Sequence, residues 1–368
     1  MNTELITIDD LIVQSGGFLI SDRDGENGGD LMSIRNLLSD HPTILITGGA
    51  GFVGSNFLRL MLPKYPSYRF INMDKLTYSG NVNNISDFLE YPNYTFIHGD
   101  ICDRARTDSI VQYHGIDIII NFAAESHVDR SIKDPLVFVT TNINGTQSLL
   151  DAAIKHCVKL FLQISTDEVY GSLDDTGFFT EASPIAPNNP YSASKASADM
   201  LISSYSNTYG LPFNIVRFGN TYGPAQYPEK LIPMVILNAL QNQRIPIHGE
   251  GQSIRDWVFV KDNNTAIDRV LHYGRRGEVY NIGSNQEKRT IEVVHLILEM
   301  LDKPNHLIEF VEDRPGQDYR YANRPDKIVN ELGWKPQYDF LEGLKHTVQW
   351  YTEHMGWWES HAGYDMYQ

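Results

Sequence analysis

The stretch Ile44-Leu45-Ile46-Thr47-Gly48-Gly49-Ala50-Gly51-Phe52-Val53-Gly54 joins a run of aliphatic residues to a cluster of glycines. An apolar periodic segment, residues 56–62, follows at once, so the order strand, tight turn, helix is predicted. The amino end of such a helix offers N–H groups and partial positive charge to a pyrophosphate. The spacing Gly48-x-x-Gly51-x-x-Gly54 is one residue longer at its first gap than the common dinucleotide fingerprint. Alone, the glycines also fit an ordinary strand–helix turn.

A second apolar run, residues 69–73, ends in Asp74, twenty residues after Gly54. An acidic residue that closes the second strand suits the ribose hydroxyls of a dinucleotide, although Asp74 by itself also fits a plain turn. Glycines and aspartate together predict a Rossmann-type dinucleotide site. No arginine follows Asp74 directly, which favours NAD over NADP, while Lys75 leaves that choice open.

The composition excludes several classes of protein. The chain has 368 residues, of which 42% are hydrophobic, and no apolar run reaches the length of a membrane span. No secretory pattern is visible, so a cytoplasmic protein is expected. The net charge of −16 argues against general binding of nucleic acid. Cys102 and Cys157 have neither metal-ligand spacing nor a disulfide framework, so no metal and two reduced, buried thiols are expected.

The organisation predicted is α/β, with a doubly wound parallel sheet and a smaller carboxyl-terminal α/β domain for the substrate. Residues 1–41 form an extension that contains a turn-rich acidic run, and a disordered or loosely docked arm is expected there. The Rossmann domain is predicted over residues 42–215, where near-continuous apolar runs fit strands buried on both faces. Residues 216–368 are expected to form mainly the substrate domain, with segments that return to the first.

The candidate catalytic residues follow the strand predicted at residues 160–164. The chain there continues Ser165-Thr166-Asp167-Glu168-Val169-Tyr170. Farther on, Tyr191 and Lys195 open a helical segment and share one face of it, because they are four residues apart. An ammonium near a phenol favours the phenolate, so a lowered pKa and a general-base role are expected for Tyr191. A surface pair with no function is the plain alternative.

Basic and hydrogen-bonding residues concentrate in four later loops. They could neutralise a nucleotide diphosphate in an otherwise acidic protein, although solvated loop charges explain any single one of them. The loops are residues 217–224, 228–233, 254–257 and 313–321. Near the carboxyl end, Trp357 and Trp358 are expected to pack rather than to catalyse.

These motifs resemble the extended short-chain dehydrogenase/reductase family and look closest to its dTDP-glucose 4,6-dehydratases. The resemblance spans about residues 43–351 and rests on residues 74–81, 124–131, 166–170, 191–195 and 313–320. Simple nucleotide-sugar 4-epimerases share the glycines and the tyrosine–lysine pair but usually lack the acidic pair. Asp167 and Glu168 therefore discriminate between the two activities.

The resemblance implies an NAD-dependent lyase of deoxysugar biosynthesis that converts a nucleotide-diphospho-hexose, first of all dTDP-glucose, into its 4-keto-6-deoxy form. Oxidation of carbon 4 makes the carbon 5 proton α to a ketone. Tyr191 would take the carbon 4 hydroxyl proton, with Thr166 and Lys195 assisting. Glu168 would remove the carbon 5 proton. Asp167, kept protonated by burial beside another carboxylate, would protonate the departing carbon 6 hydroxyl.

Other functions stay open at this point. A UDP-glucose 4,6-dehydratase would use the same residues, and a related 4-epimerase would need neither carboxylate. A non-catalytic NAD-binding scaffold would be expected to have lost the tyrosine–lysine pair or the acids. The resemblance also implies a homodimer built on helices near residues 139–157 and 196–209.

Family positions carry over residue by residue. The expected cofactor site comprises Gly48, Gly51, Phe52, Val53, Gly54, Asp74, Lys75, Leu76, Thr77, Asp100, Ile101, Phe122, Ala123, Ala124, Glu125, Thr141, Tyr191, Lys195 and Thr221. The expected nucleotide-sugar site comprises Ser126, Thr166, Asn220, Lys230, Leu231, Pro246, Ile247, His248, Arg255, Thr290, Asp313, Arg314, Pro315, Gly316 and Gln317. Arg255 is the first candidate for the pyrophosphate. Thr221, His248 and Thr290 depart from the family pattern, which leaves the base, thymine or uracil, and the sugar open.

Overall fold

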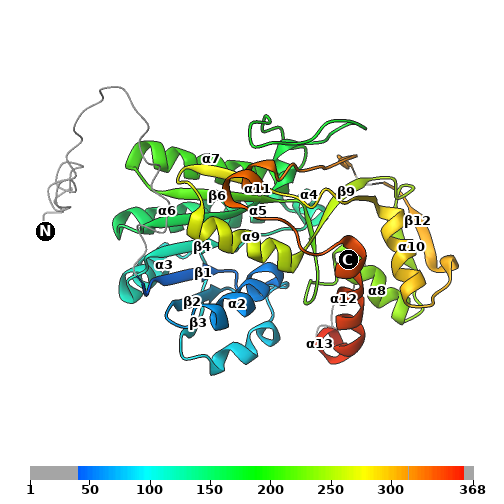
Figure 1. Ribbon diagram of the computed structural model, residues 1–368, viewed down its shortest axis with the longest axis horizontal. Helices are drawn as coiled ribbons and strands as arrows, with labels where there is room; N and C mark the ends of the chain where they lie inside the picture. Colours follow the sequence, from blue (N-terminus) through cyan, green and yellow to red (C-terminus); the bar gives the residue numbers. More distant parts are fainter. Residues whose placement is uncertain (1–39, 314, 360–368) are drawn as a thin grey trace, which may run out of the picture. The chain divides into compact units, whose positions relative to one another are not determined.

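Seven parallel strands form the central sheet of the computed structural model, which describes residues 40–313 and 315–359 (Figure 1). Their order is β10-β6-β5-β4-β1-β2-β3. Their bounds are β1 (Thr43–Thr47), β2 (Arg69–Asp74), β3 (Tyr94–His98), β4 (Ile118–Asn121), β5 (Leu160–Thr166), β6 (Phe213–Phe218) and β10 (Glu278–Ile282). The chain runs outward from β1 in one direction and then, from β4, in the other. The ends of β1 and β4 therefore form the switch point at which such sheets bind ligands.

Helices cover both faces of this sheet, which confirms the doubly wound α/β fold. One face carries α3 (Arg104–His114), α6 (Thr146–Lys155) and α7 (Pro190–Tyr209), and the other carries α2 (Phe52–Lys64), α9 (Val260–Tyr273) and α11 (Asp326–Leu332). Successive residues of β1 alternate between the two cores. Ile44 and Ile46 pack with α2 and α9, whereas Leu45 packs with α3 and α6. Both faces are thus apolar, as a buried parallel strand requires.

The start of α7 is fixed by local sequence. The side chain of Asn189 accepts a hydrogen bond from the Ser192 N–H at 2.9 Å, and Ser192 Oγ accepts one from the Asn189 N–H at 3.2 Å. Pro190 occupies the first turn, where its missing N–H costs nothing, and Gly210 ends the helix at φ 74°. This capping box fixes where Tyr191 lies in the first turn of the helix.

A smaller group of elements follows the sixth strand. It contains a three-stranded sheet of β11 (Glu287–Arg289), β9 (Ile254–Phe259) and β7 (Asn220–Tyr222), and a pair of β12 (Ile308–Val311) and β8 (Ile245–His248). The helices with it are α8 (Leu231–Leu240), α10 (Thr290–Met300), α12 (Phe340–Glu353) and α13 (Met355–Glu359). These elements share their own apolar core, against which Trp357 packs as predicted.

The described residues all belong to one compact unit, and β10, α9 and α11 pack with the large sheet although they follow β7 in the chain. The predicted boundary at residue 215 falls inside β6, and the division into two domains stays a prediction. The arm expected over residues 1–41 lies almost wholly outside the described residues, as do Arg314 and the side chain of Trp358.

Three details differ from the sequence predictions. Strand β5 continues past residue 164, because Ser165 and Thr166 pair with Arg217 and Phe218 of β6. The helix predicted over 139–157 begins with a π-helical segment, η4 (Val139–Gly145), and ends at Lys155. The expectation of two buried thiols is wrong: Cys157 is exposed and Cys102 is half-buried. Cys157 lies in the left-handed turn after α6, at φ 54°, beyond the buried face of that helix.

Candidate active site

The glycine turn between β1 and α2 leaves no room for side chains. Gly48 has φ +71°, and a Cβ there would lie 2.6 Å from the Ala123 nitrogen. A Cβ on Gly54 would lie 2.6 Å from the Gly48 carbonyl oxygen. The N-cap residue of α2 is Gly51, and no side chain of the described residues caps this helix. The amino end of α2 is therefore suited to hold a phosphate-bearing group at close backbone approach.

Asp74 stands at the end of β2, beside this turn. Its carboxylate accepts hydrogen bonds from the Ala50 N–H at 2.9 Å and from the Leu76 N–H at 2.8 Å. Burial raises the pKa of Asp74, and the two N–H donors oppose that rise. The ammonium of Lys75 lies 2.7 Å from a carboxylate oxygen of Asp100. Lys75, because of which NADP was not excluded, is thus already paired with an acid. This pairing favours NAD over NADP.

A cavity of about 300 Å³ runs from this turn to the end of β5. It is lined by every residue expected at the cofactor site except Leu76, by Asp167 and Glu168, and by Ser126, Thr166, Asn220 and Lys230 of the expected substrate site. It lies at the carboxyl ends of the six strands β1 to β6 and so fits an extended dinucleotide with its reacting end beside Tyr191.

Other predicted substrate residues lie outside the lining of this cavity. These are Leu231, Pro246, Ile247, His248, Arg255, Thr290, Asp313, Pro315, Gly316 and Gln317. Some of them lie near one another: a Cβ on Gly249, next to His248, would be 3.0 Å from an Asp313 carboxylate oxygen. Thr290 Oγ1 is 2.9 Å from Ser253 Oγ. Their role in binding a nucleotide stays a prediction.

Arg255 is buried close to the acidic pair. Its guanidinium donates hydrogen bonds to the carbonyls of Ile254 at 2.8 Å, Asp318 at 2.8 Å and Tyr319 at 3.1 Å. It also lies over the ring of Tyr321, 4.4 Å from the centroid. These bonds use three of the five guanidinium N–H groups, so the side chain is fixed in place and keeps donors for a pyrophosphate.

The two candidate acids lie on η5 (Asp167–Tyr170), directly after β5. Asp167 is 1% exposed, and its Oδ2 is buried without a hydrogen-bond partner in the described chain. Burial, together with the charges of Glu168 and Asp256, raises the pKa of Asp167 well above its ordinary value. Burial also raises the pKa of Glu168, while the cations Lys230 and Arg255 oppose the rise. The direction of the Asp167 shift is the one expected of a buried acid, and its role as the general acid stays a prediction.

Tyr191 and Lys195 share the buried side of α7. The Lys195 ammonium donates a hydrogen bond to the Ile164 carbonyl at 2.6 Å, and burial lowers the pKa of Lys195 to about 8. The prediction that Lys195 lowers the pKa of Tyr191 is wrong in this structure. Burial and the charge of Glu168 raise the pKa of Tyr191, and the hydrogen bond to Thr166 opposes the rise. Deprotonating this phenol thus depends on its hydrogen-bond partners rather than on the lysine charge alone.

A further polar cluster, missed from the sequence, joins the segment after β2, helix α4 (Val128–Lys133) and the loop before α8, and its Glu229 lines the cavity. Glu229 accepts hydrogen bonds from Arg130 Nε at 3.2 Å and from the Tyr78 hydroxyl at 3.1 Å, and its side chain is 7% exposed. The Arg130 guanidinium lies 3.8 Å from the centroid of the Tyr78 ring. These residues are 99 and 151 positions apart, so no local pattern connects them.

The cavity lining contains other residues that were not predicted, most of them neighbours of predicted ones in the chain. They are Met73, Ser79, Gly80, Gly99, Ile164, Ser165, Phe218, Gly219, Gln226, Tyr227 and Glu229. Within residues 40–313 and 315–359, no helix is both long and apolar enough to cross a membrane. The same residues contain no group of three His, Cys, Asp or Glu side chains that would hold a metal ion.

The family model for GDP-mannose 4,6 dehydratase matches residues 45–347. The chain belongs to this family. The low-salt glycan biosynthesis protein Agl12 of Haloferax volcanii is 49% identical over 84% of this chain and 98% of its own length. The dTDP-glucose 4,6-dehydratase of Xanthomonas campestris pv. campestris is 46% identical over 86% of this chain and 94% of its own. These matches confirm the resemblance drawn from the motifs.

Solved structures show the same fold. The dTDP-glucose 4,6-dehydratase of Bacillus anthracis, crystallised in complex with NAD, is 48% identical and has a TM-score of 0.81. The alignment covers 87% of this chain and 99% of that structure.

Proposed function

We propose that this protein is a cytoplasmic, NAD-dependent hydro-lyase that converts dTDP-glucose into its 4-keto-6-deoxy derivative. The observation that carries the proposal is the pair Asp167 and Glu168, held at the end of β5 in the cavity that also contains the glycine turn and Tyr191. Relatives named dTDP-glucose 4,6-dehydratase, alike over most of the chain, support it.

The residues around the cavity suit NAD. Glycines at the β1–α2 turn admit a pyrophosphate, and Asp74 disfavours a phosphate on the neighbouring ribose because its pocket is already negative. When bound, NAD supplies the acceptor for the hydride of carbon 4 and returns that hydride to carbon 6.

Tyr191 and its neighbours promote the oxidation of carbon 4. Tyr191 accepts the proton of the carbon 4 hydroxyl as the hydride leaves carbon 4, so that a ketone forms. The Thr166 hydrogen bond lowers the pKa of Tyr191 and so favours the form able to accept this proton. The ammonium of Lys195, one turn farther along α7, adds positive charge to the same region.

The elimination falls to the two acids. Glu168 removes the carbon 5 proton, now α to the ketone, and the electron pair of that bond forms the carbon 5–carbon 6 double bond. Asp167 donates its proton to the carbon 6 hydroxyl, which leaves as water. When the hydride returns to carbon 6, carbon 5 takes a proton back from Glu168. The sugar thus loses one water, and carbon 4 is oxidised while carbon 6 is reduced.

Incubation with dTDP-glucose and with UDP-glucose, one at a time, tests the proposal. A 4-keto-6-deoxy product absorbs in strong base, and dTDP-glucose is expected to form it at least about ten times faster than UDP-glucose, a difference of about 1.4 kcal/mol in activation free energy. The reverse preference would assign the enzyme to UDP-glucose. A carbon 4 epimer without the absorbing product would refute dehydration.

We also propose that the protein is a homodimer. Helix α7 packs against α5 (Pro135–Phe138) and η4, and this surface exposes large apolar side chains. Leu136 is 69% exposed, and Met200 is 57% exposed. Light scattering on the full-length protein should give twice the chain mass of 41.8 kDa, and Met200→Lys should shift the mass toward a single chain.

A further inference from the structure

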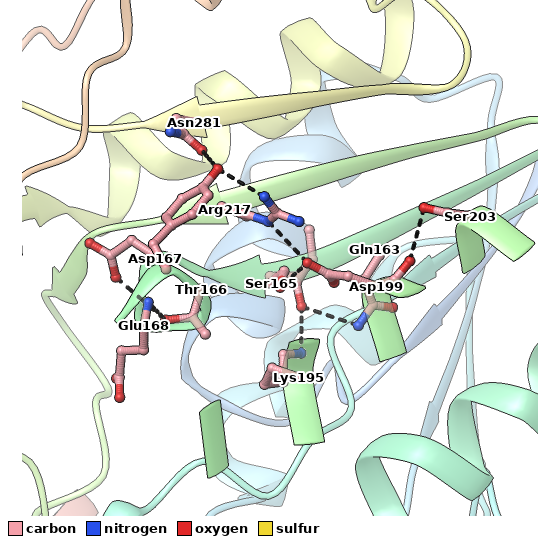
Figure 2. Close-up of polar contacts among 12 residues, drawn as sticks. Gln163, Ser165, Thr166, Asp167, Glu168, Lys195, Asp199, Ser203, Arg217 and Asn281 are labelled. Carbon is pink, nitrogen blue, oxygen red and sulfur yellow. Dashed lines mark hydrogen bonds and ion pairs between the residues drawn. The ribbon is translucent and has the colours of Figure 1, made fainter. Parts of the chain in front are cut away.

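A buried ion pair lies behind the catalytic residues. Arg217 Nε, on β6, is 3.0 Å from Asp199 Oδ2, on α7, and the two side chains are 7% and 4% exposed (Figure 2). Ser165, which precedes Thr166 on β5, donates its hydroxyl to the same carboxylate oxygen at 3.0 Å. Neither Asp199 nor Arg217 lines the cavity. Ser165 does line it, so a single hydrogen bond links the ion pair to the cavity wall.

Asp199 is one turn of α7 beyond Lys195, on the same helix face. Lys195 donates to the Ile164 carbonyl, and within residues 40–313 and 315–359 it forms no ion pair closer than 4.0 Å. Asp199 Oδ1 is buried and has no hydrogen-bond partner in the same part of the chain. The buried ammonium of Lys195 and the carboxylate of Asp199, which has one oxygen without a partner, lie on the same helix face. The charge of each therefore stabilises the charged form of the other.

Several charged or titratable groups face this end of α7. They are Tyr191 and Asp199 on the helix itself, Asp167 and Glu168 on η5, and Arg217 on β6. Burial lowers the pKa of Lys195, and the negative charge of Asp199 opposes that fall. Burial raises the pKa of Asp199, while Arg217 and Lys195 oppose that rise.

We propose that Asp199 is a positioning residue for the reaction: it is the counter-ion that keeps Lys195 protonated inside the protein, and Arg217 shares it. The ion pair holds the carboxylate at a fixed place between two cations, so that Lys195 keeps its charge without a direct salt bridge. Without a direct salt bridge, the Lys195 ammonium stays hydrogen-bonded to the Ile164 carbonyl beside the cavity and is not drawn away toward a carboxylate.

A purely structural role for the network is the competing explanation. Arg217 Nη1 also donates to the Tyr170 hydroxyl at 2.8 Å, which in turn donates to Asn281 Oδ1 at 2.8 Å (Figure 2). The network therefore ties η5 to β6 and β10 as well. If packing alone mattered, loosening it would admit water and raise the pKa of Lys195 toward its ordinary value. The counter-ion role predicts the opposite sign when Asp199 is neutralised.

The test is a pH titration of Lys195 in the full-length, NAD-saturated protein, followed by NMR of 13C-labelled lysine Cε. The Lys195 resonance is assigned by its absence from Lys195→Arg. In Asp199→Asn, the pKa of Lys195 is expected to fall by about one pH unit or more relative to the unaltered protein. In Arg217→Met it is expected to rise, since a competing cation is removed. Ser203→Ala should change nothing, because the Ser203 hydroxyl bonds the backbone carbonyl of Asp199 and not its carboxylate.

An unchanged or raised pKa of Lys195 in Asp199→Asn would overturn the proposal. If that variant does not fold, Asp199→Ser carries the same expectation. The kinetic consequence rests on the proposed function: with sugar substrate, Asp199→Asn should slow the first formation of NADH at pH 8 and recover as the pH is lowered. If no nucleotide sugar were turned over by the unaltered protein, the proposed function would fail, while the lysine titration would still decide the role of Asp199.

Discussion

The substitution Asp167→Asn should greatly lower activity without lowering the stability of the fold. The side chain is 1% exposed, and burial beside Glu168 and Asp256 raises its pKa, which favours the neutral acid in the folded protein. Asparagine has nearly the same shape and is also neutral, so little packing is lost. Its amide N–H groups are far too weakly acidic to protonate the carbon 6 hydroxyl. Loss of a general acid typically costs about 10²–10⁴ in rate, or about 2.7–5.5 kcal/mol.

The effect of Asp167 on stability has a definite sign. Below the ordinary pKa of a carboxylic acid, the folded and unfolded chains both hold the proton, and pH has no effect through this group. Above it, the unfolded chain loses the proton while the folded chain keeps it, so stability falls as pH rises, by about 1.4 kcal/mol for each pH unit up to the folded pKa. Asp167→Asn removes this loss. The variant should be as stable as the unaltered protein near pH 4 and more stable at pH 7.

Two assays check this prediction. Thermal unfolding at several pH values between 4 and 8 gives the difference in Tm, which should grow with pH. Single-turnover absorbance of NADH should show that carbon 4 is still oxidised while product formation stops. Asp87→Asn breaks only a surface ion pair with Arg59, in which Asp87 is 58% exposed, so it should leave product formation unchanged and shift Tm little at any pH. The reasoning would be refuted if Asp167→Asn were less stable at pH 7, or if it dehydrated the sugar at the normal rate.

Three further variants test the other assignments. Glu168→Gln should keep carbon 4 oxidation but stop the uptake of solvent deuterium at carbon 5, measured by mass spectrometry; unchanged uptake would mean that another residue is the base. Tyr191→Phe should slow the first appearance of NADH by about 10²–10⁴, because the proton acceptor is lost, and normal kinetics would exclude it from this role. Glu229→Gln weakens the contact between Arg130 of α4 and the loop that carries residue 229, so release of labelled NAD should be faster; an unchanged rate would show that this contact does not limit release.

Which residues line the cavity could largely be predicted from sequence, because they lie in short-range patterns. The glycines at 48, 51 and 54, the acid at 74 and the tyrosine–lysine pair each act through backbone geometry or helix spacing within a few residues. The strand runs of β1 and β5 likewise fix where the chain reaches the carboxyl edge of a parallel sheet. Local periodicity is sufficient for such features, since φ, ψ and one turn of helix determine which side chains share a face.

Long-range partners were decided only by the tertiary structure. Arg217 meets Asp199 because β6 pairs with β5 and α7 packs across them, and Arg255 is surrounded by carbonyls 63 and 64 residues away. The pKa of Tyr191 shows the consequence: helix spacing predicted a fall, whereas burial and the acids of η5 raise it. Desolvation and charge depend on everything packed around a group, and that surrounding is set by strand order and helix docking, which no short segment contains.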